Sequence, residues 1–294
     1  MLFFKNLIMS KEKISIVKMS GETDEFISTK LENSLRRSGA EEDVIKEVIE
    51  RVTASLYEGI STKEIYKMAF SLLRKKSRPA AARYKLKKAL FELGPTGFPF
   101  EKFIAEILKR EGFHTKVGVL VKGHCVQHEI DVVAEKDDDL YMVECKFHNE
   151  QGRLCDVKVP LYIHSRFRDV EKQWMKNEKE NGNKNKKIHQ GWIYTNTRFS
   201  NDALEYGNCS GLKLIGWNYP AKGNLKNKID HFGLHPITSL TTITKNEVML
   251  LLEKGVVLCQ DVCEDASLLN SIGISKIRQS KIMNESRSLC ETNF

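Results

Sequence analysis

The sequence lacks a hydrophobic run long enough to cross a membrane, and it lacks the paired cysteines of a zinc site. A membrane-spanning helix needs about 20 consecutive apolar residues, whereas the apolar stretch at 1–9 is short and has no signal-cleavage pattern. The seven cysteines are odd in number and include no Cys-x-x-Cys motif, which argues against a disulfide framework. We therefore expect a cytoplasmic protein with reduced thiols and without a membrane partner.

Acidic residues are absent from one long stretch of the chain. Between Arg74 and Lys88 there are eight basic residues and no acidic one, and a second group of lysines surrounds Asn181-Gly182-Asn183. Each segment is either a surface for phosphate groups or a solvated helix face, and both interpretations stay open. The net charge of +8 over 294 residues favours an anionic partner. That length suffices for two or three domains.

Residues 123–146 have the pattern of a two-stranded hairpin. The first strand is apolar around Asp131. The run 135–139 contains no apolar residue, which predicts the turn. The return strand alternates, so that Glu144 and Lys146 share one face. We therefore expect two carboxylates and one ammonium group to meet at one end of the hairpin.

Two carboxylates in such a place suit a hard divalent cation and a polarised water. The alternative is structural, because acidic residues beside turns are usually solvated and a Lys opposite a Glu is a common cross-strand pair. Both strands are apolar enough to be buried, however, and charged side chains are rarely buried unless they are paired. This favours the interpretation as a site.

Residues 95–220 contain an ordered set of motifs around this hairpin. The set comprises Phe100-Glu101, the segment from Gly123 to Asp131, Glu144-Cys145-Lys146, the segment from Gly191 to Ser200, and Leu214-Ile215-Gly216-Trp217. It resembles the PD-(D/E)xK nuclease superfamily, and most closely its Mrr-like branch of type IV restriction endonucleases. The resemblance implies a mixed-sheet α/β/α core with restriction-endonuclease-like topology.

The resemblance also implies an activity and its residues. A protein of this kind is a Mg²⁺-dependent (or Mn²⁺-dependent) endodeoxyribonuclease that hydrolyses phosphodiester bonds. By position, Asp131 and Glu144 would bind the metal, and Lys146 would act with them in catalysis. Glu101, in the first turn of a predicted helix, would be a further catalytic acid. The alternative for Glu101 is a carboxylate that stabilises the helix dipole.

Three basic side chains that follow Glu144-Cys145-Lys146 are candidates for contact with a phosphate backbone. Residues 153–174 look helical after Pro160, and Arg166 and Arg168 lie on that helix. His148 follows Lys146 by two positions. It is either a contact of the scissile phosphate or a residue of a surface loop.

Residues 14–93 predict a compact unit of one hairpin and four helices. The hairpin turns at Ser20-Gly21, and a first helix has Ser28 as its N-cap. The second helix covers about 41–57. Ser61-x-x-Glu64 has the pattern of a capping box for a third helix over about 62–75. A fourth helix follows Pro79 and carries the basic stretch through Leu93.

This unit is similar to an ATP-cone, a regulatory nucleotide-binding domain. The similarity is carried by Val17-Lys18-x-x-Gly21, Lys30-Leu31, the segment from Gly59 to Tyr66, and Ala81-Ala82-Arg83-Tyr84. It implies that ATP or dATP binds, with Lys18, Lys30 and Arg83 on the phosphates and Thr62 near the nucleotide. Ammonium and guanidinium groups beside helix starts suit a polyphosphate.

The cone pattern has two departures. Met19 stands where a basic residue is frequent, and Ile27 stands where an acid or an amide is frequent. The alternative to a nucleotide site is therefore a cone that has lost its ligand, in which Lys18 and Lys30 are ordinary surface charges.

The remaining sequence predicts a boundary and a helical ending. Gly94 and Pro95 separate the cone from the nuclease domain. In residues 235–294, Gly255 and Gly273 each follow a predicted helix and precede a β-branched residue. That pattern is similar to a helix-hairpin-helix module, and the alternative is a helical cap on the nuclease core.

Together these predictions describe a three-part chain: a cone at 14–93, a nuclease domain at 95–220 and a helical region at 235–294. We expect a DNA endonuclease regulated by an adenine nucleotide. A homodimer is a further expectation, because nucleases that cut both strands commonly pair two sites. The alternative function is a non-catalytic, nucleotide-regulated DNA-binding protein that uses a nuclease fold.

Overall fold

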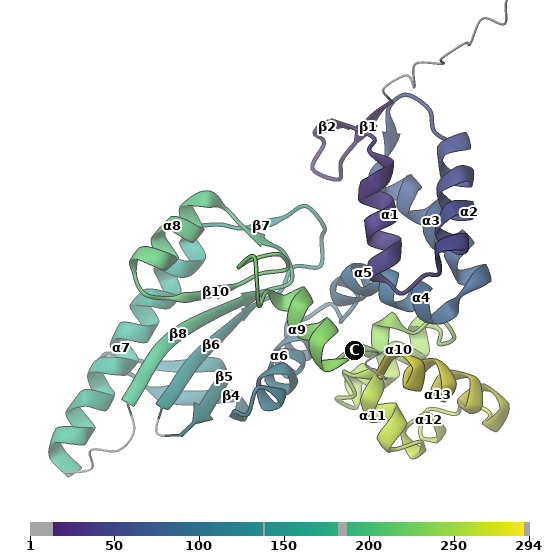
Figure 1. The fold of residues 1–294 in the computed structure, drawn as a ribbon. Coiled ribbons are helices and arrows are strands. Elements are labelled where there is room, and N and C mark those ends of the chain that lie inside the picture. Colours follow the sequence, from purple (N-terminus) through teal and green to yellow (C-terminus); the bar gives the residue numbers. More distant parts are fainter. Residues whose placement is uncertain (1–13, 138, 182–186, 291–294) are drawn as a thin grey trace, which may run out of the picture. The chain divides into compact units, whose positions relative to one another are not determined.

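The structure is a computed structural model that describes residues 14–137, 139–181 and 187–290. The chain divides into two compact units between Tyr84 and Lys85 (Figure 1). This division lies upstream of the predicted boundary at Gly94, because Leu86 and Leu90 are buried in the core of the second unit. Among the helices within the described ranges, none combines the length and the apolar character needed to cross a lipid bilayer.

Residues 14–84 contain a small sheet of three strands in the order β2-β1-β3. β1 pairs antiparallel with β2 and parallel with β3. The strands are β1 Ser15–Val17, β2 Thr23–Glu25 and β3 Ile60–Ser61. The predicted hairpin is confirmed, and Gly21 in its turn has φ 85°, a left-handed conformation that favours glycine. The sequence does not predict β3, because two residues are too few to show an alternating pattern.

Four helices complete the described part of this unit: α1 Ser28–Arg37, α2 Glu42–Ala54, α3 Thr62–Lys76 and α4 Arg78–Tyr84. The predicted capping box is confirmed, since Ser61 and Glu64 each accept a hydrogen bond of 3.2 Å from the backbone N–H of the other. The predicted N-cap at Ser28 is wrong, because Ile27 is the N-cap and Ser28 is already helical. One apolar core joins the sheet to the helices, with Ile16, Leu35, Val48, Ile60 and Leu73 among its members.

The predicted fourth helix is wrong in its extent. The chain forms α4 and then, after Lys85, a separate helix, α5 Leu86–Phe91, which belongs to the second unit. The basic stretch is therefore divided between three helices in two units. Three of its lysines form ion pairs, Lys76 with Glu47 at 2.7 Å, and Lys85 and Lys88 with Glu92 at 3.0 Å and 3.5 Å. Apart from Lys176, the side chains of the second lysine group lie outside the described residues.

The second unit is built on a mixed sheet, which in the described residues has the strand order β10-β8-β6-β5-β4. β5 is antiparallel to both β4 and β6, whereas β6, β8 and β10 are parallel. The strands are β4 His114–Lys122, β5 Gln127–Lys136, β6 Asp139–Lys146, β8 Lys187–Thr195 and β10 Lys213–Ile215. A small parallel pair joins β7 Leu154–Cys155 to β9 Arg198–Phe199. The predicted mixed sheet is confirmed.

The turn between β5 and β6 is shorter than predicted. The sequence predicts a turn over 135–139, yet Glu135 pairs with Leu140 and Lys136 pairs with Asp139. Glu135 also pairs with His114 of β4. Pairing of Glu135 on both sides and of Lys136 on one side therefore keeps these charged residues in the strand beyond its apolar part.

Helices cover both faces of the sheet (Figure 1). They are α6 Phe98–Arg110, α7 Lys158–Asn181, α8 Asn201–Cys209 and α9 Leu225–Phe232. Successive residues of β8 pack on opposite faces of the sheet. Trp192 packs in a cluster with α6 and α9, whereas Ile193 packs in a cluster with α7 and α8. The predicted α/β/α core is confirmed.

Residues 237–290 form a helical region, as predicted. It contains a 3₁₀ turn at Ile237–Ser239 and the helices α10 Lys245–Glu253, α11 Cys259–Glu264, α12 Ser267–Asn270 and α13 Lys276–Cys290. The carboxylate of Glu285 accepts hydrogen bonds from the backbone N–H and the hydroxyl of both Thr241 and Thr242. These four bonds tie α13 to the loop before α10. The helix-hairpin-helix interpretation of this region stays a prediction.

Candidate functional site

Asp131 is fixed beside Glu144 by the pairing of β5 with β6. Val132 pairs with Val143 in antiparallel register, so the next residues along this pairing, Asp131 and Glu144, lie side by side. Oδ2 of Asp131 accepts a hydrogen bond of 2.7 Å from the backbone N–H of Cys145. That bond uses one carboxylate oxygen and leaves the other for a ligand.

Glu144 and Lys146 follow the alternation of β6. Val143 and Cys145 are buried in the core, whereas Glu144 is half-buried and Lys146 is exposed. Lys146 forms no hydrogen bond or ion pair with a described residue. The strand thus presents one carboxylate and one unpaired ammonium group on the same face.

The structure brings Glu101 to these residues. Glu101 lies in the first turn of α6, next to the fully buried Phe100. The ring of Phe100 packs on that of Phe147, with 5.7 Å between centroids, which holds the start of α6 against the end of β6. Burial and the negative charge of Asp131 raise the pKa of Glu101 to about 7. The charges of Asp131, Glu129 and Glu144 contribute to this shift after burial, so Glu101 lies within electrostatic range of these acids.

The carboxylates of this group repel one another. Burial and the charge of Asp131 raise the pKa of Glu144 to about 7, although Arg166 and Lys146 oppose that shift. Burial also raises the pKa of Asp131, against the hydrogen bond from Cys145. Half-buried acids with raised pKa values are typical of functional sites.

Arg166 of α7 places a positive charge beside these acids. Its Nη1 donates a hydrogen bond of 2.8 Å to Oε2 of Glu144, and its Nη2 donates to the backbone oxygen of Glu129. The sequence predicts that Arg166 faces a phosphate backbone, whereas here it faces the acids. The spacing of 22 residues between Glu144 and Arg166 carries no signal of this pairing.

The loop after Lys146 is held by a buried asparagine. The backbone N–H of His148 donates to Oδ1 of Asn196 at 2.9 Å, and Nδ2 of Asn196 donates to the oxygen of His148 at 2.7 Å. His148 is 8% exposed, so its interpretation as a surface residue is wrong. Burial lowers the pKa of His148, and its Nε2 has no hydrogen-bond partner among the described residues. The sequence does not predict the role of Asn196, since it depends on the pairing of β6 with β8.

The residues present fit a divalent cation. Within the described ranges, no group of three or more His, Cys, Asp or Glu side chains is placed to hold a metal ion. Mg²⁺, however, is usually held by one or two carboxylates, with water and substrate phosphate as its other ligands. Asp131 and Glu144 offer two carboxylates, and the guanidinium of Arg166 already stands where positive charge is required.

In the cone, Lys18 and Lys30 converge on one carboxylate. Oδ2 of Asp24 lies 3.0 Å from Nζ of Lys18 and 3.5 Å from Nζ of Lys30. The hydrogen bond from Lys18, together with that from the backbone N–H of Glu25, lowers the pKa of Asp24. Two of the predicted phosphate ligands are thus gathered around an anion.

Thr62 lies at the same end of the cone as Lys18. Val17 pairs with Ser61 in parallel register, so Lys18 and Thr62 are the next residues along two neighbouring strands. Thr62 is also the first residue of α3. Its backbone N–H is therefore one of those that a helix start offers to an anion.

The structure does not bring Arg83 to this group. Arg83 lies on α4, and its Nη1 would be 3.3 Å from a Cβ at Gly39, which follows the C-terminal end of α1. Arg83 therefore lies beside the C-terminal end of α1, whereas Lys30 lies near the N-terminal end of that helix.

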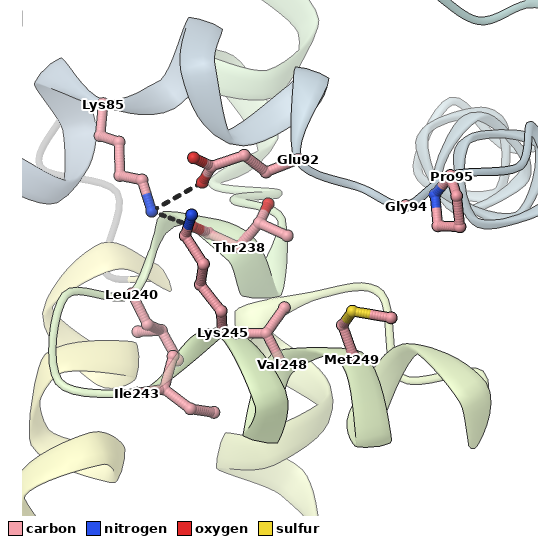
Figure 2. A pocket seen from close by; sticks show the side chains of 10 residues that line it. All are labelled: Lys85, Glu92, Gly94, Pro95, Thr238, Leu240, Ile243, Lys245, Val248 and Met249. Atoms are coloured by element: carbon pink, nitrogen blue, oxygen red, sulfur yellow. Dashed lines mark hydrogen bonds and ion pairs between the residues drawn. The ribbon is translucent and has the colours of Figure 1, made fainter. Parts of the chain in front are cut away.

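A cavity of about 270 Å³ lies in the second unit. Figure 2 shows the ammonium group of Lys85 between Glu92, at 3.0 Å, and the backbone oxygen of Thr238, at 2.7 Å. Apolar side chains, among them Leu240 and Met249, form much of its lining. Its carboxylate is already paired, and the residues that line it include none of the acids of the candidate site.

Three families match successive parts of the chain. Residues 14–87 match the ATP cone domain, residues 95–159 match a family described as restriction endonuclease, and residues 235–290 match the C-terminal domain of AF1548-like proteins. The predicted fusion of an ATP-cone with an Mrr-like nuclease domain is confirmed.

Two relatives cover a smaller part of the chain. An "uncharacterized protein" of Archaeoglobus fulgidus is 39% identical over 187 residues, which are 63% of this chain and 99% of that protein. The crystal structure of a protein of unknown function, AF1548, is similar with a TM-score of 0.54 and 37% identity, over 66% of this chain and 98% of the other. Both relatives are therefore matched almost entirely, whereas this chain extends beyond them.

Proposed function

This chain belongs to the AF1548-like family, and we propose that it is a metal-dependent DNA endonuclease whose activity responds to ATP or dATP. The observation that carries the proposal is the half-buried group of Asp131, Glu144 and Glu101 beside Lys146. Grouped carboxylates that lack full neutralisation favour a divalent cation, and the restriction-endonuclease-like domain supplies the context in which such a site cuts DNA.

Each residue of this group has its own role in the proposed hydrolysis. A bound Mg²⁺ or Mn²⁺ would lower the pKa of a water molecule and stabilise negative charge on the phosphate. Asp131 and Glu144 supply the oxygen ligands. Lys146, exposed and unpaired, orients the attacking water and stabilises the charge that develops beside it. Glu101, with a pKa of about 7, is suited to accept a proton near neutral pH.

The substrate we propose is DNA, held mainly through its phosphates. The net charge of +8 favours a polyanion. Arg168 of α7 is exposed, two residues beyond Arg166, and is suited to a phosphate contact. Contacts of this kind do not read bases, so we expect affinity that falls steeply with salt and depends little on sequence.

Binding of a nucleotide to the cone would change the activity of the nuclease domain. Lys18, Lys30 and Thr62 lie at one end of the cone and suit a triphosphate, and Arg83 remains a predicted phosphate ligand at some distance from them. A ligand shifts only an equilibrium between states that it distinguishes. We therefore expect Lys18→Met to remove the effect of ATP or dATP on cleavage and to leave cleavage without nucleotide unchanged.

The test is cleavage of supercoiled plasmid and linear DNA with Mg²⁺ or Mn²⁺, with and without ATP or dATP. Wild-type protein is compared with Asp131→Asn and with Asp139→Asn, which changes an acid at the opposite end of the same hairpin. Metal-dependent cleavage that only Asp131→Asn removes is the expected result. DNA binding of equal strength in all three proteins, with no product from any of them, would contradict the proposal and favour a non-catalytic DNA-binding protein. A homodimer stays a prediction.

A further inference from the structure

The guanidinium of Arg166 occupies the carboxylate that the proposed metal would need. It donates to Oε2 of Glu144 at 2.8 Å, and only 11% of the Arg166 side chain and 21% of the Glu144 side chain are exposed. Removing one partner of an ion pair this well shielded from water leaves the other charge uncompensated, at a higher cost than in a surface pair. Arg166 is therefore a bound partner of Glu144 rather than a passing surface contact.

Arg166 is also held in place by neighbours other than Glu144. Its Nη2 donates to the backbone oxygen of Glu129, and its guanidinium lies 5.3 Å from the ring centroid of Tyr162, one turn earlier on α7. Its Nε is buried and has no hydrogen-bond partner among the described residues. These contacts would remain if Glu144 turned away.

A second contact fixes α7 against the start of β5. Oδ2 of Asp169, three residues after Arg166, lies 2.8 Å from Nε2 of His128, and Oδ1 accepts from the backbone N–H of Cys125 at 2.9 Å. The spacing of three puts Arg166 and Asp169 on neighbouring positions of one helix face. The helix thus holds the start of β5 at His128 and at Glu129, which fixes the position of the guanidinium.

We propose that Arg166 is a positioning residue that holds Glu144 in the metal-free protein and competes with the divalent cation for it. This inference rests on the proposed function, because it takes Asp131 and Glu144 as the metal ligands. The exchange is a switch of one carboxylate between two cations, and no covalent bond changes. Binding of the metal then leaves the guanidinium held by Glu129 and Tyr162, with its Nη1 and Nε unpaired and able to donate to an anion.

The competition sets a direction for the effect of substitution. A metal ion that binds Glu144 must break its charge-assisted hydrogen bond with Arg166. Such bonds contribute more free energy than neutral hydrogen bonds do. Replacing Arg166 with a residue that cannot hold Glu144 should therefore strengthen metal binding, by about tenfold for the loss of one such bond. A role in building the metal site predicts the opposite sign.

The test is titration of Mn²⁺ into the full chain at pH 8 without DNA or nucleotide, with EPR of the free ion as the readout. Arg166→Gln is compared with wild-type protein and with Arg168→Gln. Arg168 lies on the same helix, is 65% exposed and pairs with Glu171, so this control removes the same charge without touching Glu144. Asp131→Asn identifies binding that occurs elsewhere. We expect tighter binding in Arg166→Gln and wild-type affinity in Arg168→Gln.

Arg166→Lys separates competition from simple repulsion. Lysine keeps the charge but lacks the planar fork that reaches Glu144 and Glu129 together. Competition predicts an affinity between those of wild-type protein and Arg166→Gln, whereas repulsion alone predicts wild-type affinity. Far-UV circular dichroism and cooperative melting check the fold, and Arg166→Lys provides the answer if Arg166→Gln does not fold.

The outcomes separate this inference from the proposed function. Equal or weaker Mn²⁺ binding in Arg166→Gln, with DNA cleavage by the wild-type protein intact, would overturn the inference alone. Tighter binding in Arg166→Gln without cleavage of DNA by any variant would support the inference and contradict the endonuclease. Absence of Mn²⁺ binding in all variants would overturn both.

Discussion

The nuclease domain contains a group of carboxylates, and the cone contains a group of lysines. The two groups have opposite charge but a similar arrangement. In the nuclease domain, the carboxylate of Glu144 is held by one guanidinium, that of Arg166. In the cone, the ammonium groups of Lys18 and Lys30 share one carboxylate, that of Asp24. Each group thus contains an internal counter-ion with the charge of its expected ligand, a metal cation in one case and a phosphate in the other.

The groups differ in burial, and burial decides how strongly the internal counter-ion acts. The side chains of Glu144 and Arg166 are 21% and 11% exposed, whereas those of Lys18 and Lys30 are 42% and 64% exposed. Water screens the cone pairs, so each contributes little to stability. The acids of the nuclease domain are screened less, and the pKa values of Glu101 and Glu144 rise to about 7. Substitutions should therefore have large effects in the nuclease domain and small ones in the cone.

The largest effect is expected from Glu144→Gln. Loss of a metal ligand removes several kcal/mol of transition-state stabilisation, so the cleavage rate should fall on the order of a thousandfold. Single-turnover cleavage of plasmid DNA measures this. Glu150→Gln, an exposed acid six residues further on, is the control. Equal activity of Glu144→Gln and Glu150→Gln would contradict the role of Glu144.

Lys146→Met should lower the cleavage rate by about a hundredfold, because a positioned group that orients water or transfers a proton contributes at least that much. Mn²⁺ affinity should change much less than the rate, since Lys146 is not a metal ligand. Lys122→Met, an exposed lysine at the end of β4, is the control. A rate loss matched by an equal loss of metal affinity would show that Lys146 serves the metal site instead.

The pH dependence distinguishes the two groups further. Protonated carboxylic acids do not bind a cation, and Glu101 and Glu144 take up protons below a pH of about 7. The rise in melting temperature caused by Mg²⁺ should therefore be larger at pH 8 than at pH 6. Without metal, the stability of the protein changes with pH in the opposite direction. A pKa raised above 4.5 lets the folded state bind more protons than the unfolded state. Stability of the metal-free protein should then fall between pH 5 and pH 7.5.

Thermal melts with and without Mg²⁺ across this pH range check both statements. Nucleotide binding by the cone provides the internal reference, because the pKa of Asp24 is lowered and Asp24 stays ionised over that range. A Mg²⁺ effect that does not vary with pH would contradict the proposed acid group.

The smallest effect is expected from Asp24→Asn. Removing the internal anion frees Lys18 and Lys30 for a triphosphate, and the small contribution of exposed pairs limits the gain in ATP affinity to about fivefold. Isothermal titration with ATP at two salt concentrations measures it, and the gain should shrink at higher salt. Glu32→Gln on α1 is the control. Weaker ATP binding would show that Asp24 orders the lysines for the nucleotide.

The sequence predicts the parts of the fold that depend on local pattern. The hairpin with Asp131 and Glu144, the capping box at Ser61 and the helix that begins near Glu101 follow from residue spacing. The break at Lys85 does not, because local propensity favours a continuous helix there. Its cause is tertiary, since Leu86 and Leu90 are buried in the second unit.

The candidate site shows the same division. Asp131, Glu144 and Lys146 were close enough in sequence for strand alternation to join them, and the family resemblance selected Glu101. Arg166 and Asn196 reach the site from α7 and from the end of β8. Their contacts depend on which strands pair and on how α7 crosses the sheet, which no local spacing encodes.

The sequence by itself determined the order of the domains and the residue types available for chemistry, because periodicity, caps and motifs act over short distances. Only the tertiary structure decided which charges meet. Asp24 was not distinguished from other surface acids until folding placed it between Lys18 and Lys30. Arg166 likewise acquired its role only when α7 packed on the sheet beside Glu144. Electrostatic partners are chosen by distance and burial in space, and both are properties of the folded chain.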